Sequence, residues 1–94
     1  MLHSKDEILN AIGRKSSLLV LLYVHHHPDC SQTEVMNNTE GENFRTKFVR
    51  IKELIEVGLL VIDHTSRHNT TSLRTTDKGR RLCTALELIL EESE

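Results

Sequence analysis

The sequence has few of the residues that interrupt helices or build aromatic cores. Its 94 residues include one proline, four glycines, two phenylalanines, one tyrosine and no tryptophan. A chain with so few turn-forming residues is expected to be mainly helical, and aliphatic side chains have to fill its core. The longest apolar run, residues 18–24, falls well short of the roughly 20 residues that cross a membrane. We therefore expect no membrane partner.

Signals for secretion are also missing. Residues 1–13 are charged and periodic, unlike a signal peptide. The two cysteines, Cys30 and Cys83, are too few for a disulfide scaffold and are expected to be free thiols. These features predict a cytoplasmic protein that forms a single domain over residues 1–94.

No catalytic motif is present, since the sequence lacks a nucleophile elbow, a phosphate-binding loop and a zinc-protease helix. We therefore predict that the protein is not an enzyme and uses no cofactor. His25, His26 and His27 are consecutive, but adjacent residues of a helix point about 100° apart and cannot all ligate one metal. We predict no metal site, although a metal-responsive regulator that uses this run and Cys30 stays an alternative.

The formal net charge of −2 conceals a strong asymmetry along the chain. Residues 1–44 carry a net charge of −3, residues 45–81 carry +5 and residues 82–94 carry −4. A basic middle segment between acidic ends can present a cationic face to a polyanion. Charge alone does not distinguish such a face from an ordinary solvated surface.

Capping and periodicity signals divide the chain into a defined order of elements. Ser4 with Glu7, and Ser31 with Glu34, match the capping box that opens a helix. Pro28 ends the helix before it, because the residue that precedes a proline avoids helical geometry. The pattern predicts helices over residues 5–12, from a cap at Ser16 or Ser17 to no later than residue 27, and over 32–37, 42–57 and 76–92, with hairpin strands at 59–62 and 71–75.

The helix predicted over residues 42–57 has one apolar side and one cationic side. On a helical wheel the side expected to face the core holds Phe44, Phe48, Ile51, Leu54 and Ile55. The side expected to face outward holds Thr46, Val49, Arg50 and Glu53, with Arg45 and Lys47 on its flanks. Such a face has the donors and small apolar groups that suit a DNA major groove.

In their order and spacing, three stretches resemble the small winged-helix transcriptional regulators of archaea and bacteria, broadly the ArsR-, PadR- and MarR-like families. Residues 11–22 resemble the loop and first hydrophobic core helix of these families. Residues 51–60, IKELIEVGLL, resemble the end of the recognition helix, and residues 73–80, LRTTDKGR, resemble the passage from the wing into the last helix. Two positions depart from the pattern: Thr75 replaces a usual leucine, and Lys47 stands where an apolar residue is common.

The resemblance implies a mainly α winged helix-turn-helix fold with flanking N- and C-terminal helices. Residues 31–57 would form the helix-turn-helix, residues 59–75 the wing, and residues 76–92 a C-terminal dimerisation helix. It also implies a sequence-specific DNA-binding transcriptional regulator. Its recognition helix, residues 42–57, would enter the major groove, and the wing loop, residues 63–70, would contact the DNA backbone or the minor groove.

Side-chain chemistry selects the candidate contacts to double-stranded DNA. Arginine matches guanine as a bidentate donor, lysine suits phosphates, and valine methyls can meet a thymine methyl. The start of the helix after Ser31 offers amides and hydroxyls to a phosphate. The candidate set is Ser31, Gln32, Thr33, Asn43, Arg45, Thr46, Lys47, Val49, Arg50, Lys52, Arg67, His68 and Asn69.

The last predicted helix has more apolar surface than one small domain needs to bury. We therefore predict a homodimer through residues 5–12 and 77–92, whose twofold symmetry would match palindromic DNA sites. The other function that the sequence leaves open is a winged-helix module for protein–protein interaction, in which the same cationic face binds a partner chain.

Overall fold

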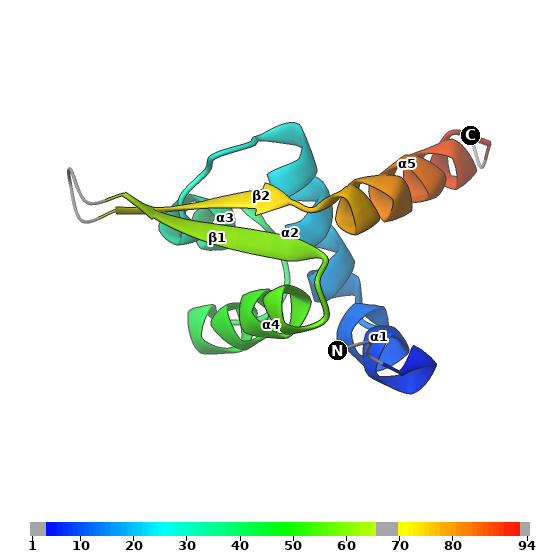
Figure 1. The fold of residues 1–94 in the computed structure, drawn as a ribbon, viewed down its shortest axis with the longest axis horizontal. Helices are drawn as coiled ribbons and strands as arrows, with labels where there is room; N and C mark the ends of the chain where they lie inside the picture. The colour runs from blue at the N-terminus through cyan, green and yellow to red at the C-terminus, as the bar shows by residue number, and fades with distance from the viewer. Residues whose placement is uncertain (1–3, 66–69, 93–94) are drawn as a thin grey trace.

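The computed structural model describes residues 4–65 and 70–92 of the chain, and this part contains five helices and a two-stranded antiparallel sheet (Figure 1). The predicted order of helices and hairpin is confirmed, with boundaries that shift by one or a few residues. The elements are α1 (Lys5–Ile12), α2 (Lys15–His26), α3 (Gln32–Asn38), α4 (Phe44–Glu56), β1 (Leu60–Thr65), β2 (Thr70–Thr75) and α5 (Asp77–Glu92).

Local polar side chains begin α1 and α3 as predicted. The Ser4 hydroxyl accepts a hydrogen bond from the Glu7 amide at 3.2 Å, and the Glu7 carboxylate accepts one from the Ser4 amide at 3.4 Å. This reciprocal pair is the capping box expected at the first helix. At α3 the Ser31 hydroxyl accepts from the Glu34 amide at 3.0 Å.

The start of α2 differs from the prediction that Ser16 or Ser17 would cap it. The helix already begins at Lys15, and its N-cap residue Arg14 makes no side-chain capping hydrogen bond. Both serines lie inside the first turn and are buried. Ser16 has a partner elsewhere, because its hydroxyl donates to the carboxylate of Glu42.

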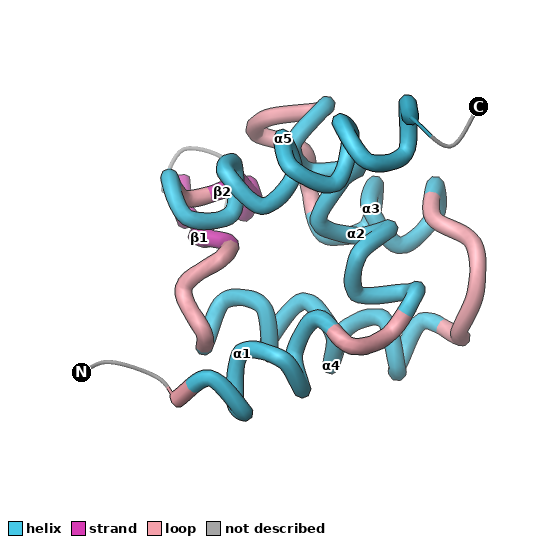
Figure 2. The backbone as a smooth tube through the Cα atoms, turned by 90° about the vertical axis from the view of Figure 1, so that its right-hand side faces the viewer, coloured by secondary structure: helices cyan, strands magenta, loops and turns pink. Residues whose placement is uncertain are grey.

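Helix α2 lies at the centre of the fold, as its nearly continuous apolar run predicted. Val20, Leu21 and Val24 have no solvent-accessible surface. The helix contacts α1, α3, α4, α5 and β2, so the other elements are arranged around it (Figures 1 and 2). The surrounding core is built of aliphatic side chains and both cysteines; its largest members besides α2 are Ile51, Leu54, Leu59, Leu60 and Leu73.

The hairpin is joined to the loop between α2 and α3. Leu60 pairs with Thr75 at one end of the ladder, and Leu73 pairs with Ile62 within it. The backbone of Leu73 also accepts from the Asp29 amide at 2.9 Å and donates to the Cys30 carbonyl at 2.8 Å. The loop before α3 is therefore held against the wing.

Helix α5 begins against the turn that joins α4 to β1. The Thr76 hydroxyl donates to the Gly58 carbonyl at 2.6 Å and accepts from the Gly79 amide at 3.1 Å, so it caps α5 as predicted. Gly79 is buried against the backbone of Leu59, where a Cβ atom would overlap the carbonyl oxygen. A side chain at position 79 would thus prevent this close approach.

The second half of α5 extends away from the rest of the fold (Figure 1). The apolar face predicted for this helix is only half-buried at Leu82 and Leu86, and Leu88, Ile89 and Leu90 are more than half exposed. Helix α1 lies on the opposite side of α2 from α5 in both views (Figures 1 and 2). Within the described residues, no helix is long and apolar enough to cross a membrane.

Candidate nucleic-acid interface

Helices α3 and α4, joined by residues 39–43, form the helix-turn-helix that the sequence predicted. The N-terminal end of α4 and the distal part of the hairpin extend toward the same side of the molecule (Figure 1). This arrangement places the first turns of α4 at a protruding edge, away from the α1 and α5 ends. A DNA-binding role requires the predicted contact residues to be exposed at this edge.

Asn43 is the N-cap of α4, which sets where the helix starts. Its Oδ1 accepts a hydrogen bond from the Thr46 amide at 2.9 Å. The side chain was predicted to approach base edges, and it is exposed at the start of the helix. Its oxygen is used in the cap, so the amide NH₂ is the part that can donate to another molecule.

Lys47 does not lie on an outward flank, and that prediction was wrong. Its side chain is buried, and the Nζ atom donates to the Met36 carbonyl at 2.9 Å and also to the Thr39 carbonyl. These carbonyls belong to the last turn of α3 and the residue after it, which a helix leaves without internal partners. Lys47 therefore caps the C-terminal end of α3 and joins the two helices of the motif.

Arg50 is also buried, which contradicts its prediction as an outward-facing contact to guanine. Its Nη1 atom donates to Glu53 Oε1 at 2.7 Å, and Nε and Nη2 each lie 3.4 Å from an oxygen of Glu42. Glu42 additionally accepts from the Ser16 hydroxyl of α2. The guanidinium group thus holds α4, the turn before it and α2 together.

The outward face of α4 differs in part from the prediction: Val49 and Arg45 are exposed as expected, and two phenylalanines join them. Phe44 and Phe48, which were expected in the core, are 54% and 41% exposed, and Val49 is 44% exposed. Arg45 and Lys52 are exposed beside them, and the Lys52 Nζ lies 5.9 Å from the centroid of the Phe48 ring. The helix therefore presents two cations among three apolar side chains.

The remaining candidates of the helix-turn-helix are all at least partly exposed. Thr46 is half-buried beside the cap of α4. At the start of α3, Gln32 is half-buried and Thr33 is exposed. Ser31 uses its hydroxyl oxygen as the acceptor of the α3 cap, and its O–H remains available as a donor.

The wing candidates Arg67, His68 and Asn69 lie outside the described residues. In the described part of the hairpin, the guanidinium of Arg74 bonds the Asp63 carboxylate and has its Nε 3.3 Å from Asp29 Oδ1. These two carboxylates neutralise Arg74, and Asp63 holds the pKa of the guanidinium above its usual value. Arg74 therefore ties the wing to the loop before α3.

The histidine run contacts two neighbouring side chains. His25 and His26 bind the same Glu87 carboxylate, with Nε2–oxygen distances of 3.4 and 2.9 Å, and thereby join α2 to α5. His27 stacks on Tyr23 with 4.1 Å between ring centroids. Over the described ranges, 4–65 and 70–92, no group of three or more histidine, cysteine or acidic side chains has the geometry to hold a metal ion.

The two cysteines are free thiols inside the core. Burial raises the pKa of both Cys30 and Cys83 to about 11. A nearby carboxylate adds to each shift, Glu34 for the first and Glu87 for the second. At neutral pH both thiols are protonated and are poor nucleophiles.

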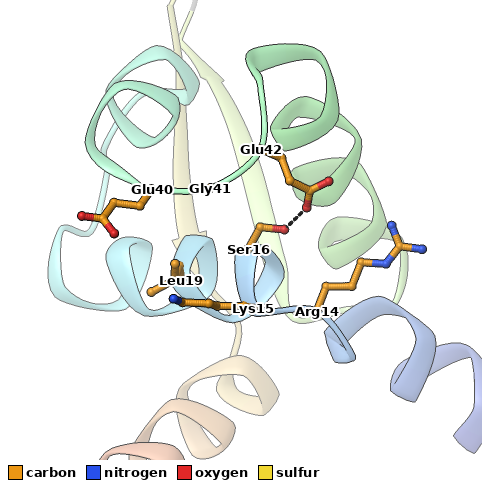
Figure 3. Close-up of a pocket in the computed structure, with 7 residues that line it drawn as sticks. All are labelled: Arg14, Lys15, Ser16, Leu19, Glu40, Gly41 and Glu42. Atoms are coloured by element: carbon orange, nitrogen blue, oxygen red, sulfur yellow. Dashed lines mark hydrogen bonds between the residues drawn. The ribbon is translucent and has the colours of Figure 1, made fainter.

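An open pocket lies between the start of α2 and the turn of the helix-turn-helix (Figure 3). In this view the Ser16 hydroxyl meets Glu42 in the middle of the pocket, while Glu40 and Arg14 point to opposite sides. The pocket adjoins the Arg50 ion pairs through Glu42. Sequence reasoning missed it, because its walls come from segments that are far apart in the chain; they are Arg14, Lys15, Ser16, Leu19, Glu40, Gly41 and Glu42.

One feature of the sequence could have found the true phase of α4. Positions 47, 50, 51 and 54 have the spacing of a buried helical stripe, and all four are buried. In the winged-helix families that the sequence resembles, an apolar residue is common at the position of Lys47, and this position belongs to the same buried stripe. A helical wheel that ranks residues by hydrophobicity alone instead predicted that the side with Phe44 and Phe48 faces the core.

Comparison with known proteins establishes the fold. No protein-family model and no curated protein matches the sequence significantly. Among solved structures, the chain is similar to a possible HxlR-family transcriptional factor from Thermoplasma volcanium, with a TM-score of 0.77 and 21% identity over 90% of this chain and 76% of that one. The architecture is therefore a winged helix-turn-helix.

Two further structures show the same likeness. One is the homodimeric winged helix-turn-helix DNA-binding domain of Mb0332 from Mycobacterium bovis, a possible ArsR-family regulator, with a TM-score of 0.74 and 16% identity over 94% of this chain and 79% of that one. The other is Streptococcus pneumoniae FabT in complex with DNA, with a TM-score of 0.66 and 15% identity over 90% of this chain and 66% of that one.

Proposed function

We propose that this chain is a sequence-specific, double-stranded DNA-binding transcriptional regulator that places α4 in the major groove. The observation that carries the proposal is the outward face of α4, on which Arg45 and Lys52 are both exposed. Residues 43–52 contain four cations and no anion. Two of these cations are buried with internal partners, carbonyls for Lys47 and carboxylates for Arg50, and the other two are exposed and available to a polyanion.

The motif's rigidity supports this assignment. Because Lys47 binds carbonyls at the end of α3 and Arg50 binds Glu42 in the turn, two cations of α4 hold this helix to α3 and to the turn. A recognition helix has to be held in register with the groove, since small displacements lose base contacts. In this proposal Arg45, Thr46 and Val49 approach base edges, while Lys52 and the start of α3 contact phosphates.

The solved structures add support at the level of the fold. The FabT structure contains DNA, and the Mycobacterium bovis domain is described as homodimeric and DNA-binding. We extend the proposal to a homodimer of this chain through α1 and α5. Leu9 on α1, and Leu88 and Leu90 on α5, are more than half exposed, and a partner subunit that covered them would remove this apolar surface from water.

Duplex binding and its salt dependence test the proposal directly. Binding to a random-sequence pool of duplexes, followed by recovery of the retained sequences, is expected to yield a palindromic motif. Affinity for that duplex is expected to fall linearly on a logarithmic salt scale, because phosphate contacts release counterions. Arg45→Ala is expected to weaken binding by about 1–3 kcal/mol if Arg45 reads a base.

Lys15→Ala is the matched control, since Lys15 is an exposed cation at the start of α2, outside α4 and outside the proposed dimer helices α1 and α5. This variant is expected to bind the duplex like the native chain. Equal losses for Lys15→Ala and Arg45→Ala would mean that binding follows overall charge and not the α4 face. Absence of any duplex binding at low salt would refute the proposed function.

A protein-interaction module is the second candidate, and the exposed side chains of Phe44, Phe48 and Val49 favour it. In that case the α4 face would bind a partner chain, and duplex binding would be absent at low salt. Phe48→Ala would then weaken retention of the partner in a pull-down. Native binding to duplexes, with no protein retained, would exclude this candidate.

A further inference from the structure

Both phenylalanines of this chain lie on the solvent side of one helix. Phe44 and Phe48 are about half exposed on α4, while the core is filled by leucine, isoleucine and valine. Burial of a phenylalanine is worth about 1.5–3 kcal/mol, so exposure of both gives up a large stabilisation for a short chain. Exposed apolar groups that gather on one surface mark a binding site.

The side chains form two adjacent ridges along α4. Phe44, Phe48 and Lys52 follow one another at intervals of four residues, and Arg45 and Val49 form the neighbouring ridge at the same interval. Lys52 lies 5.9 Å over the Phe48 ring, so a cation ends the first ridge. Arg45 places the second cation beside Phe44 at the start of the helix.

This combination identifies the chemistry of the ligand. The two cations, Arg45 and Lys52, lie beside the exposed apolar side chains of α4. This pattern fits a polyanion that also carries apolar groups at a fixed distance from its charges. Double-stranded DNA has that composition, since the phosphates border a major groove in which the C5-methyl of thymine is the apolar group. The first turns of α4 hold Phe44 and Phe48, and a recognition helix contacts bases through its N-terminal residues.

We infer that Phe44, Phe48 and Val49 read thymine methyl groups, so that each half-site of the bound DNA contains thymines facing α4. The inference rests on the proposed function and adds its specificity: apolar contact with methyl groups, with the cations contacting guanine or phosphate. The phenylalanines are thus specificity-determining residues of the DNA site. Neither ring has to move, because both are already exposed on the outer side of the helix.

Replacement of thymine by deoxyuridine tests the inference, because it removes only the methyl group. A duplex recovered from the random pool is synthesised with thymine or with deoxyuridine at each position of the half-site, and native affinity is measured at one salt concentration. Each methyl in contact is expected to contribute about fourfold, which is the equivalent of the transfer free energy of one methylene group. Positions outside the α4 footprint are expected to show no change.

Variants assign the methyl contacts to side chains. Phe44→Ala and Phe48→Ala are each expected to abolish the difference in affinity between thymine and deoxyuridine at one position of the half-site. Phe48→Leu is expected to retain part of this difference. Arg45→Ala is the control on the same face, and it should weaken both duplexes by the same factor. Circular dichroism of each variant tests whether the fold is kept, and we expect that it is because these positions are exposed.

Each other outcome overturns the inference in a distinguishable way. Equal affinity for thymine and deoxyuridine duplexes would refute methyl recognition and leave DNA binding intact. A ratio that persists in Phe44→Ala, Phe48→Ala and Val49→Ala would assign the methyl contact to another surface. No binding to any duplex, with retention of a protein that Phe48→Ala releases, would refute both the inference and the proposed function.

Discussion

At the scale of single residues, the main feature is the burial of two cations in the helix that was expected to display them. Lys47 donates to two carbonyls at the end of α3, and Arg50 is surrounded by the carboxylates of Glu42 and Glu53. A buried charge is tolerated only where such partners replace its water. If an Arg50→Ala variant lost DNA binding, the cause would therefore be the loss of these structural contacts and not the loss of a base contact.

Lys47→Met tests this role, because it keeps the aliphatic stem and removes the donors. The variant leaves the Met36 and Thr39 carbonyls without their Lys47 donor, and we expect the free energy of unfolding to fall by about 1–3 kcal/mol. Urea denaturation followed by circular dichroism measures it. Lys52→Met on the exposed face is the control and should lose less than about 1 kcal/mol; equal losses would contradict the capping role of Lys47.

At the scale of elements, the attachment of α5 depends on a close backbone approach. Thr76 spans the Gly58 carbonyl and the Gly79 amide, and Gly79 lies directly against Leu59. The segment of residues 73–80 that resembles winged-helix regulators includes both Thr76, which caps α5, and Gly79 in its first turn. Thr76 and Gly79 are explained by this junction between α4, the wing and α5.

Gly79→Ala is expected to destabilise the fold although alanine is the better helix former. A helix interior normally gains about 1 kcal/mol from this change. Here the added Cβ overlaps the Leu59 carbonyl, and we expect a net loss of about 2–3 kcal/mol in the free energy of unfolding. Thr84→Ala, an exposed position on the same helix, should stay within about 0.5 kcal/mol. Stabilisation of Gly79→Ala would show that α5 is not packed so closely.

At the scale of the whole molecule, the proposed DNA-binding surface and the proposed dimer surface lie on different helices. The N-terminal end of α4 lies at one protruding edge, and α1 and the second half of α5, which carry exposed leucines, lie toward the opposite end (Figure 1). A twofold dimer through the leucine-bearing ends would leave both α4 edges open. Two such edges could then contact successive half-sites of a palindromic duplex.

Leu88→Ser tests the proposed dimer. Because a twofold interface loses one leucine from each subunit, we expect the dissociation constant of the dimer to rise by about 100-fold or more. Sedimentation equilibrium over a concentration series measures it, with Val61→Ser, an exposed apolar residue of the wing, as the control. A native chain that sediments as a monomer at micromolar concentration would contradict the dimer.

The sequence by itself determined the elements of this protein, because their signals are local. The serine caps of α1 and α3, the stop at Pro28 and the apolar run of α2 act within a few residues, and each feature recurs in the structure. The order of these elements was enough to indicate a winged helix-turn-helix.

Only the tertiary structure decided which side of α4 faces outward. Lys47 and Arg50 are buried because carbonyls at the end of α3 and the carboxylate of Glu42 reach them across the turn. A helical wheel contains no such partners, so it ranks the two cations as exposed and the two phenylalanines as buried. These partners, which are distant from α4's own sequence pattern, lower the free-energy cost of burying Lys47 and Arg50. The side of α4 that remains exposed to a ligand is therefore set by the tertiary structure.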